Sequence, residues 1–342
     1  MRIILAAIAV LVFSPAVVAG ELPLFASQET LHLTLEFPVN TLLRQRDERP
    51  VLDGVLRYTD DSGQELALDM SMTTRGKSRL EYCSFPPLTL DLKRKQLEGS
   101  VFEGQNKLKI VTHCKNGSQH LRYLHQELGI YRAFNVISEF SYRVRPLRIT
   151  YSDTDGKRGA DEHDAFFIES HDEVASRHGM ERSRIPQLEV MQLDAAQATL
   201  YSVFQYMIAN TDWSMIKGPG EEGCCHNGKV IMEPGTQDGW IVLPYDFDQA
   251  GLINTRYSAP AEALRLKSVR QRLYRGRCLH NDQLPATVDL FNRKRSEIEE
   301  AIIPEGLNKR TKRSSLKYID DFYKIINDPK QLEKKVLSAC LG

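Results

Sequence analysis

The strongest constraint on the fold is a change of residue pattern along the chain, from alternating segments to helical stripes. Between about residues 29 and 112, apolar and polar residues alternate, as in "LHLTLEF" (31–37) and "LALDMSM" (66–72). A turn-forming Asp-Asp-Ser-Gly segment lies between these two. Alternation with period two is typical of strands that bury one face. The N-terminal part is therefore predicted to be rich in β-strands, with further strands at 88–92 and 107–111.

A long helix is predicted directly after these strands. Ser118 is expected to cap it, and its buried stripe comprises Leu121, Leu124, Leu128, Tyr131 and Phe134. Strands at 144–151 and 165–170 should follow. Beyond about residue 175, we expect a helix capped by Asp194, a strand at 240–248 and a C-terminal helix over 316–326.

These patterns predict an α+β fold with a bilobal plan. Residues 21–172 form a β-rich N-terminal lobe with one long helix, and residues 173–342 form a mainly helical C-terminal lobe. Ligands commonly bind in clefts between such lobes.

The first 20 residues have the pattern of a secretory signal peptide. Arg2 precedes an apolar run from Ile3 to Phe13, and small residues at 16–20 provide a cleavage site. We therefore expect export to the periplasm or to the extracellular space, with cleavage after Ala19 or Gly20. The apolar run is shorter than the roughly 20 residues that span a bilayer.

The charge balance excludes some classes of partner. The 45 basic and 45 acidic residues cancel, whereas a general nucleic-acid binder is usually basic. No later segment is apolar enough to span a membrane, so we expect none in the mature chain.

Six cysteines in an exported chain predict disulfide bonds rather than free thiols. Cys83 and Cys114 lie in neighbouring predicted strands, and we expect them to pair. The Cys224-Cys225-His226 segment leaves a soft-metal site open as an alternative, but zinc ligands are usually spaced as C-x₂₋₄-C.

Several oxygen-bearing side chains stand out in the second half of the chain. They are Asn210, Asp212, Asn227, Asp246 and Asp248. Hard cations such as Mg²⁺ bind one or two carboxylates together with substrate phosphates. Phosphoryl transfer also needs a carboxylate that receives the proton of the acceptor hydroxyl, and cationic side chains on the phosphates. Asp212 is the candidate for the first role, and Arg75, Lys107 and Lys109 are the candidates for the second.

The order of these segments resembles the spore coat protein H (CotH) kinase-like family. The matching segments are "RGKS" (75–78), the long helix and strand over 121–151, "AFFIES" (165–170), "FQYMIANTDWS" (204–214) and "VLPYDFDQAG" (242–251). The resemblance covers about residues 70–255. It implies an atypical, bilobal protein-kinase-like fold that uses ATP with Mg²⁺ or Mn²⁺.

The resemblance also implies residue roles. Asp212 would be the catalytic base, Asp246 and Asn227 would bind the metal, and Asp248 would assist them. The acceptor would be an unidentified hydroxyl-bearing molecule, for example a protein.

Two other functions are consistent with the same residues. One is a non-catalytic binding or structural protein of the envelope or the secreted fraction, and the other is a metal-dependent hydrolase. Individual residues also have simpler interpretations. Asp212 could form only an Asx turn after a helix. Lys107 and Lys109 could form the solvated face of an edge strand, and Arg75 and Arg79 could pair with surface carboxylates.

Overall fold

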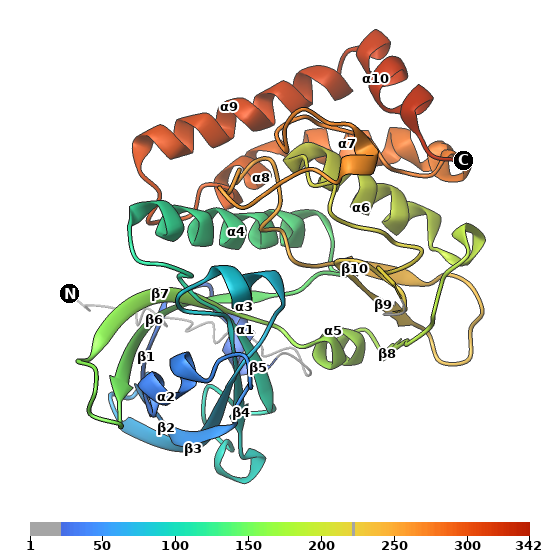
Figure 1. Ribbon diagram of the computed structural model, residues 1–342. Coiled ribbons are helices and arrows are strands. Elements are labelled where there is room, and N and C mark those ends of the chain that lie inside the picture. Colours follow the sequence, from blue (N-terminus) through green and yellow to red (C-terminus); the bar gives the residue numbers. More distant parts are fainter. Residues whose placement is uncertain (1–21, 221–222) are drawn as a thin grey trace, which may run out of the picture.

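The computed structural model describes residues 22–220 and 223–342, so the predicted signal peptide lies outside the described residues. A β-barrel, a small sheet and a layer of helices follow one another across the molecule (Figure 1).

Seven strands close the barrel in the order β1-β2-β3-β4-β5-β7-β6. They are β1 (Leu31–Phe37), β2 (Leu52–Thr59), β3 (Glu65–Thr74), β4 (Leu88–Leu92), β5 (Lys107–Val111), β6 (Val144–Asp153) and β7 (Asp161–Ile168). Neighbouring strands are antiparallel except β1 and β6, which pair in parallel and close the barrel. Alternate residues fill the interior, among them Leu33, Leu35 and Phe37 of β1. The alternation in the sequence therefore corresponds to the inside and outside of the barrel.

A three-stranded antiparallel sheet in the order β10-β9-β8 lies between the barrel and the outer helices (Figure 1). Its strands are β8 (Glu181–Arg182), β9 (Gly228–Met232) and β10 (Ile241–Pro244).

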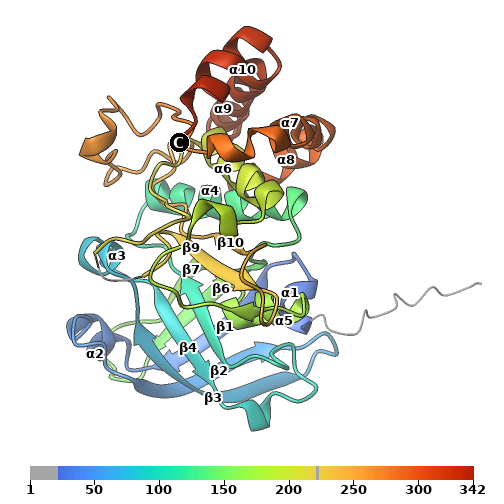
Figure 2. The ribbon, with the colours of Figure 1, turned by 90° about the vertical axis from the view of Figure 1, so that its right-hand side faces the viewer.

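The helices form a layer above the barrel and a few short elements around it (Figure 2). The layer comprises α4 (Ser118–Ile137), α6 (Ala195–Ile208), α7 (Leu284–Arg293), α8 (Arg295–Ala301), α9 (Lys309–Ile326) and α10 (Pro329–Lys335). The short helices are α1 (Pro23–Ala26), α2 (Val39–Arg44), α3 (Ser78–Tyr82) and α5 (His171–Arg177). One apolar core joins the outer wall of the barrel to this layer through Phe166 of β7, Phe134 of α4, Phe204 of α6 and Phe322 of α9.

The predicted bilobal protein-kinase-like architecture is wrong. The N-terminal strands close on themselves into a barrel. The closing pair joins β1 to β6, which are more than 100 residues apart, and such parallel pairing leaves no local signal in the sequence.

Two predicted helix caps have different outcomes. Asp194 caps α6, because its carboxylate accepts the Gln197 N–H at 2.8 Å. Ser118 instead is the first residue of α4, and Gly117 occupies the cap position with φ +108°. That backbone conformation favours glycine, which explains the one-residue difference.

Candidate functional site

The candidate site lies where the barrel meets the small sheet, and its centre is Asp246 in the turn after β10. The antiparallel register of β9 and β10 makes the residues before β9 and after β10 neighbours. Accordingly, the Tyr245 N–H donates to the Asn227 carbonyl at 3.0 Å. The Asp246 N–H donates to the hydroxyl of buried Tyr131 at 3.0 Å, and Asp246 has φ +61°. The hairpin and α4 therefore fix the backbone of Asp246.

The Asp246 carboxylate lines a pocket of about 40 Å³ together with Arg75, Arg79, Glu127 and Tyr245. It receives no hydrogen bond or ion pair from any residue that the structure describes. Burial and repulsion from Asp248 raise the pKa of Asp246 to about 7, against the attraction of Arg79. A buried carboxylate without a donor favours the approach of a proton or a cation.

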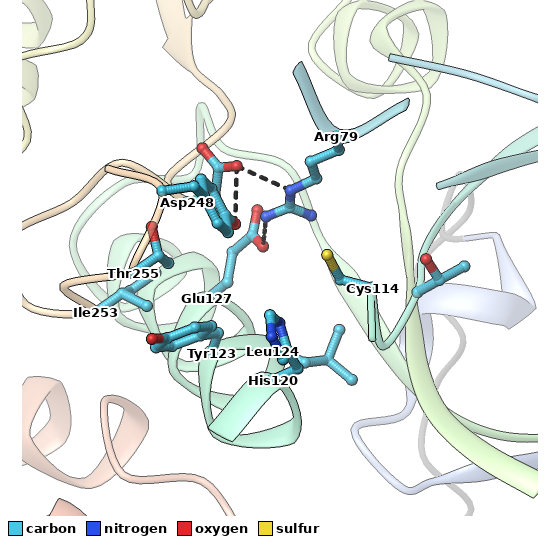
Figure 3. Close-up of a pocket in the computed structure, with 11 residues that line it drawn as sticks. Arg79, Cys114, His120, Tyr123, Leu124, Glu127, Asp248, Ile253 and Thr255 are labelled. Atoms are coloured by element: carbon cyan, nitrogen blue, oxygen red, sulfur yellow. Dashed lines mark hydrogen bonds and ion pairs between the residues drawn. The ribbon is translucent and has the colours of Figure 1, made fainter. Parts of the chain in front are cut away.

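Next to Asp246, Arg79 of α3 joins two buried carboxylates. Its Nε lies 2.9 Å from Asp248 Oδ2, and its Nη2 donates to Glu127 of α4 (Figure 3). The Tyr257 hydroxyl also donates to Asp248 at 3.2 Å. Burial raises the pKa of Glu127, although Arg79 opposes this. Burial by itself would lower the pKa of Arg79, but attraction to Glu127 and Asp248 raises it well above its usual value. One guanidinium thus balances two carboxylates, and the third carboxylate, that of Asp246, lacks a cation of its own.

Cationic side chains lie on the barrel side of Asp246. Arg75 donates to the Tyr245 hydroxyl, and the Lys109 ammonium lies 4.7 Å from the centre of the Tyr245 ring. Burial lowers the pKa of Lys109 to about 7, and Arg75 and Lys229 lower it further by repulsion. Arg75, Lys109 and Lys229 repel one another, and a polyanion bound near Tyr245 would reduce this repulsion.

The two candidate lysines of β5 have different surroundings. Lys109 is partly buried beside Tyr245, whereas the Lys107 side chain is 67 % exposed and pairs with Asp91 at 3.3 Å. The solvated-face interpretation therefore describes Lys107 and does not describe Lys109.

Asp212 and Asn227 are in direct contact. Asn227 Nδ2 donates to the Asp212 carboxylate at 2.9 Å and to the Asp212 backbone carbonyl at 2.7 Å. The other carboxylate oxygen of Asp212 lies 2.7 Å from His226 Nε2. Since Asn227 also pairs with Tyr245, the structure connects Asp212 to the residue next to Asp246 through Asn227. The fifth oxygen candidate, Asn210, is buried, and its side chain accepts the Asp212 N–H at 3.0 Å.

The donor set fits a hard cation at Asp246. The Asp246 carboxylate lacks a donor, and the Asn227 side chain uses only its nitrogen in bonds to the described residues. Mg²⁺ commonly takes one or two such oxygens and fills its other positions with water and phosphate. Asp248 is already held by Arg79 and Tyr257. Within 22–220 and 223–342, no group of three or more His, Cys, Asp and Glu side chains is arranged to hold a metal.

Disulfides join all six cysteines. Cys83 pairs with Cys114, which confirms the predicted bond, and Cys224–Cys225 and Cys278–Cys340 are the others. The first bond ties the end of α3, which carries Arg79, to the segment after β5. No helix in the described part of the chain is long and apolar enough to cross a bilayer.

The sequence matches no protein-family model and is not significantly similar to any curated protein. The candidate site is therefore argued from its geometry.

Sequence reasoning missed several residues of the site. Arg79 pairs with buried carboxylates rather than surface ones, and Tyr131 comes from the buried face of α4. Glu127 was considered as a partner for a lysine or as a solvated helical residue, but it is buried and pairs with Arg79. Only the helical spacing of Glu127 and Tyr131, four residues apart, indicated that they share a face. Lys229 and His171 lie near Lys109, and nothing in their local sequence indicates it.

Proposed function

We propose that the protein transfers a phosphoryl group from a nucleotide such as ATP to an acceptor hydroxyl, with Mg²⁺ or Mn²⁺ as cofactor. The observation that carries the proposal is the position of the Asp246 carboxylate. It has no donor among the described residues and shares its pocket with Arg75. Asn227 pairs with the backbone of the preceding Tyr245, and the Lys109 ammonium lies against the Tyr245 ring. A carboxylate for a metal and cations for phosphates are the recurring parts of phosphoryl-transfer sites.

Asp246 and Asn227 would hold the metal. When bound, the metal supplies positive charge to the oxygens of the transferred group. The chain supplies the geometry, because the β9–β10 hairpin and the Tyr131 hydroxyl fix the backbone on both sides of these ligands. Arg79 pairs with Asp248 and Glu127, so that Asp246 is the carboxylate left for the cation.

Arg75 and Lys109 would bind the phosphates. Lys109 is partly buried among like charges, and a polyanion relieves this repulsion. Its contact with the Tyr245 ring keeps the ammonium within the electrostatic reach of Asp246, on the side where phosphates would bind.

Asp212 would orient the acceptor hydroxyl and take its proton. Its side chain is 43 % exposed, so an acceptor can reach it from solvent. Hydrogen bonds from Asn227 and His226 hold the carboxylate in one orientation, which general-base catalysis requires. The motif resemblance to the spore coat protein H family supports this assignment of roles. The acceptor is proposed only as a hydroxyl-bearing molecule, for example a protein, and no nucleic acid is proposed as a partner.

We further propose that the protein acts outside the cytoplasm, in the periplasm or the extracellular space. The N-terminal leader pattern supports this, and so do three disulfide bonds, which persist in oxidising compartments.

Binding and transfer assays with combinations of nucleotide and divalent cation test the proposed activity. Thermal unfolding is measured with ATP, ADP or AMP, each with Mg²⁺, Mn²⁺ or a chelator, and labelled γ-phosphate transfer is followed in the same samples. We expect stabilisation that needs both ATP and the divalent cation, together with transfer to the protein itself or to added hydroxyl acceptors. Absence of nucleotide binding with every cation would contradict the proposal and favour the non-catalytic alternative. Transfer to water alone would favour the hydrolase.

A further inference from the structure

The turn that carries Asp212 lies between α6 and Ser214, outside any helix or strand. α6 ends at Ile208, the next residue has φ +51°, and Ser214 pairs with His226 through a single bridge. A largely buried irregular segment must find partners for its backbone polar groups outside the regular hydrogen-bond ladders. The partners of this turn therefore decide how firmly the Asp212 carboxylate is placed.

Side chains bind the backbone of this turn. The Asp212 N–H donates to the Asn210 side chain at 3.0 Å, and the Asp212 carbonyl accepts from Asn227 at 2.7 Å. The Trp213 indole N–H donates to the Asn210 carbonyl at 2.9 Å. These contacts leave the carbonyls on either side of Asp212, those of Thr211 and Trp213, to another partner.

That partner is Arg275, which is more than 60 residues further along the chain. Its Nη1 donates to the Thr211 carbonyl at 2.5 Å and to the Trp213 carbonyl at 2.9 Å. The guanidinium also lies over the Trp213 ring, 5.2 Å from the ring centre. Arginine suits this position, because its planar guanidinium presents several N–H donors in a fixed geometry. One side chain thus binds the turn on both sides of Asp212.

The charge of Arg275 also acts on this turn. Burial lowers the pKa of Arg275, and interactions with Tyr201 and Asp212 oppose the shift. An arginine in a protein stays protonated at neutral pH. A positive charge therefore lies within electrostatic reach of the carboxylate that we propose as the base.

We propose that Arg275 is a positioning residue for the phosphoryl transfer, which fixes the turn that presents Asp212 to the acceptor hydroxyl. The inference rests on the proposed role of Asp212 as general base. Catalysis depends on the placement of such a group, and a displacement of about 1 Å can cost about 10²-fold in rate. Loss of the Arg275 contacts should therefore lower the rate of transfer and leave nucleotide binding unchanged.

Arg272 provides a matched comparison. It donates to the carbonyls of Met207, at 3.1 Å, and of Tyr318, and its guanidinium lies 3.9 Å from the centre of the Tyr318 ring. Like Arg275 it is partly buried, and burial lowers its pKa. It joins α6 to α9, however, rather than binding the turn of Asp212.

The test measures phosphate transfer and the binding of ATP with Mg²⁺ by wild type, Arg275→Met and Arg272→Met. Thermal unfolding is recorded for each protein, and rates are compared per folded molecule. We expect Arg275→Met to transfer phosphate about tenfold more slowly or worse, with an affinity for ATP within about twofold of the wild type. Arg272→Met should also lose stability but keep the wild-type rate. Arg275→Lys should recover part of the rate, because its ammonium can still donate to one carbonyl.

Histidine-selective NMR tests the position of Asp212 without any activity. The His226 ring lies 2.7 Å from the Asp212 carboxylate, so its resonance reports where that carboxylate lies. Arg275→Lys should shift the His226 resonance, whereas Arg272→Lys should not. The resonance of exposed His32 should be unchanged in both variants.

The outcomes separate this inference from the proposed function. A wild type that transfers no phosphate would contradict the proposed function, and the NMR measurement would still decide whether Arg275 positions Asp212. If Arg275→Met does not fold, the rate comparison is made with Arg275→Lys. A wild-type rate without Arg275, an equal loss of rate in Arg272→Met, a matching loss of ATP affinity, or an unshifted His226 resonance would each overturn the inference.

Discussion

The Nε of Arg79 lies 2.9 Å from Asp248 Oδ2 in a contact where both side chains are largely buried, 14 % and 7 % exposed. The same guanidinium also pairs with Glu127. The ion group therefore ties α3 to α4 and to the segment after β10, and it keeps two of the three carboxylates at the site neutralised.

Removal of Arg79 should destabilise the fold strongly. Arg79→Met leaves Glu127 and Asp248 buried without a cation, which typically costs about 3–5 kcal/mol. Urea unfolding measures the loss. The matched control is Arg293→Met, whose pair with Asp289 is 66 % exposed on both sides and should contribute less than about 1 kcal/mol. Equal effects of the two variants would show that the buried ion group has no structural role.

Glu173 should make stability depend on pH. Burial raises the pKa of Glu173 to about 7, and the Glu169 charge contributes, although hydrogen bonds to Ser170 oppose the shift. The folded state thus keeps a proton that the unfolded state loses near pH 4.5. The contribution of Glu173 is therefore most favourable below about pH 4.5 and is lost as pH rises through 7.

Glu173→Gln removes this dependence and keeps the helix cap, because a glutamine oxygen can still accept the Ser170 N–H, now 3.1 Å from the carboxylate. We expect the variant to match the wild type near pH 4 and to exceed its stability near pH 8, by on the order of 2 kcal/mol. Denaturant unfolding across pH measures both. Exposed Glu98→Gln serves as the control. A variant that loses stability near pH 8 would show that the charged form of Glu173 is favourable.

Lys109 and Lys107 provide a matched pair for nucleotide binding. Lys109→Met should weaken the binding of ATP with Mg²⁺ about tenfold or more, because it removes a partly buried charge from the phosphate side of the site. Lys107→Met should change the affinity less than about twofold, since its ammonium is in solvent beside Asp91. Calorimetry measures both affinities. The reverse order would assign the phosphates to Lys107.

The sequence indicated local features of this fold better than global ones. Alternating residues revealed the barrel strands, Asp194 was recognised as a cap, and the Cys83–Cys114 bond followed from neighbouring strands. Closure of the barrel was missed, because pairing of β1 with β6 is a relation between distant segments. The kinase-like bilobal expectation failed for that reason.

For the candidate site too, the sequence indicated single residues better than the contacts between distant segments. The polar residues after α6 and β10 were found as candidates because they follow apolar elements. The contacts that connect them were not predicted, since these depend on the β9–β10 register and on the pairing of Asn227 with Tyr245. Pairing of Arg79 with surface carboxylates was one interpretation of the sequence, but its partners Glu127 and Asp248 are buried.

The central claim is that Asp246 binds the metal and that Asp212 orients the acceptor hydroxyl and takes its proton. Calorimetric titration of ATP with Mg²⁺ into wild type, Asp246→Asn and Asp212→Asn, run beside a phosphotransfer assay, tests both roles. Asp238→Asn, an exposed change in the β9–β10 loop, is the control for an Asp-to-Asn substitution.

We predict that Asp246→Asn loses the metal-dependent part of nucleotide binding, because an amide cannot replace the carboxylate charge. Asp212→Asn should still bind the nucleotide but transfer phosphate about 10²–10⁴-fold more slowly, the usual contribution of a general base. Asp238→Asn should behave like the wild type. Metal-dependent nucleotide binding by Asp246→Asn at wild-type affinity would contradict the account.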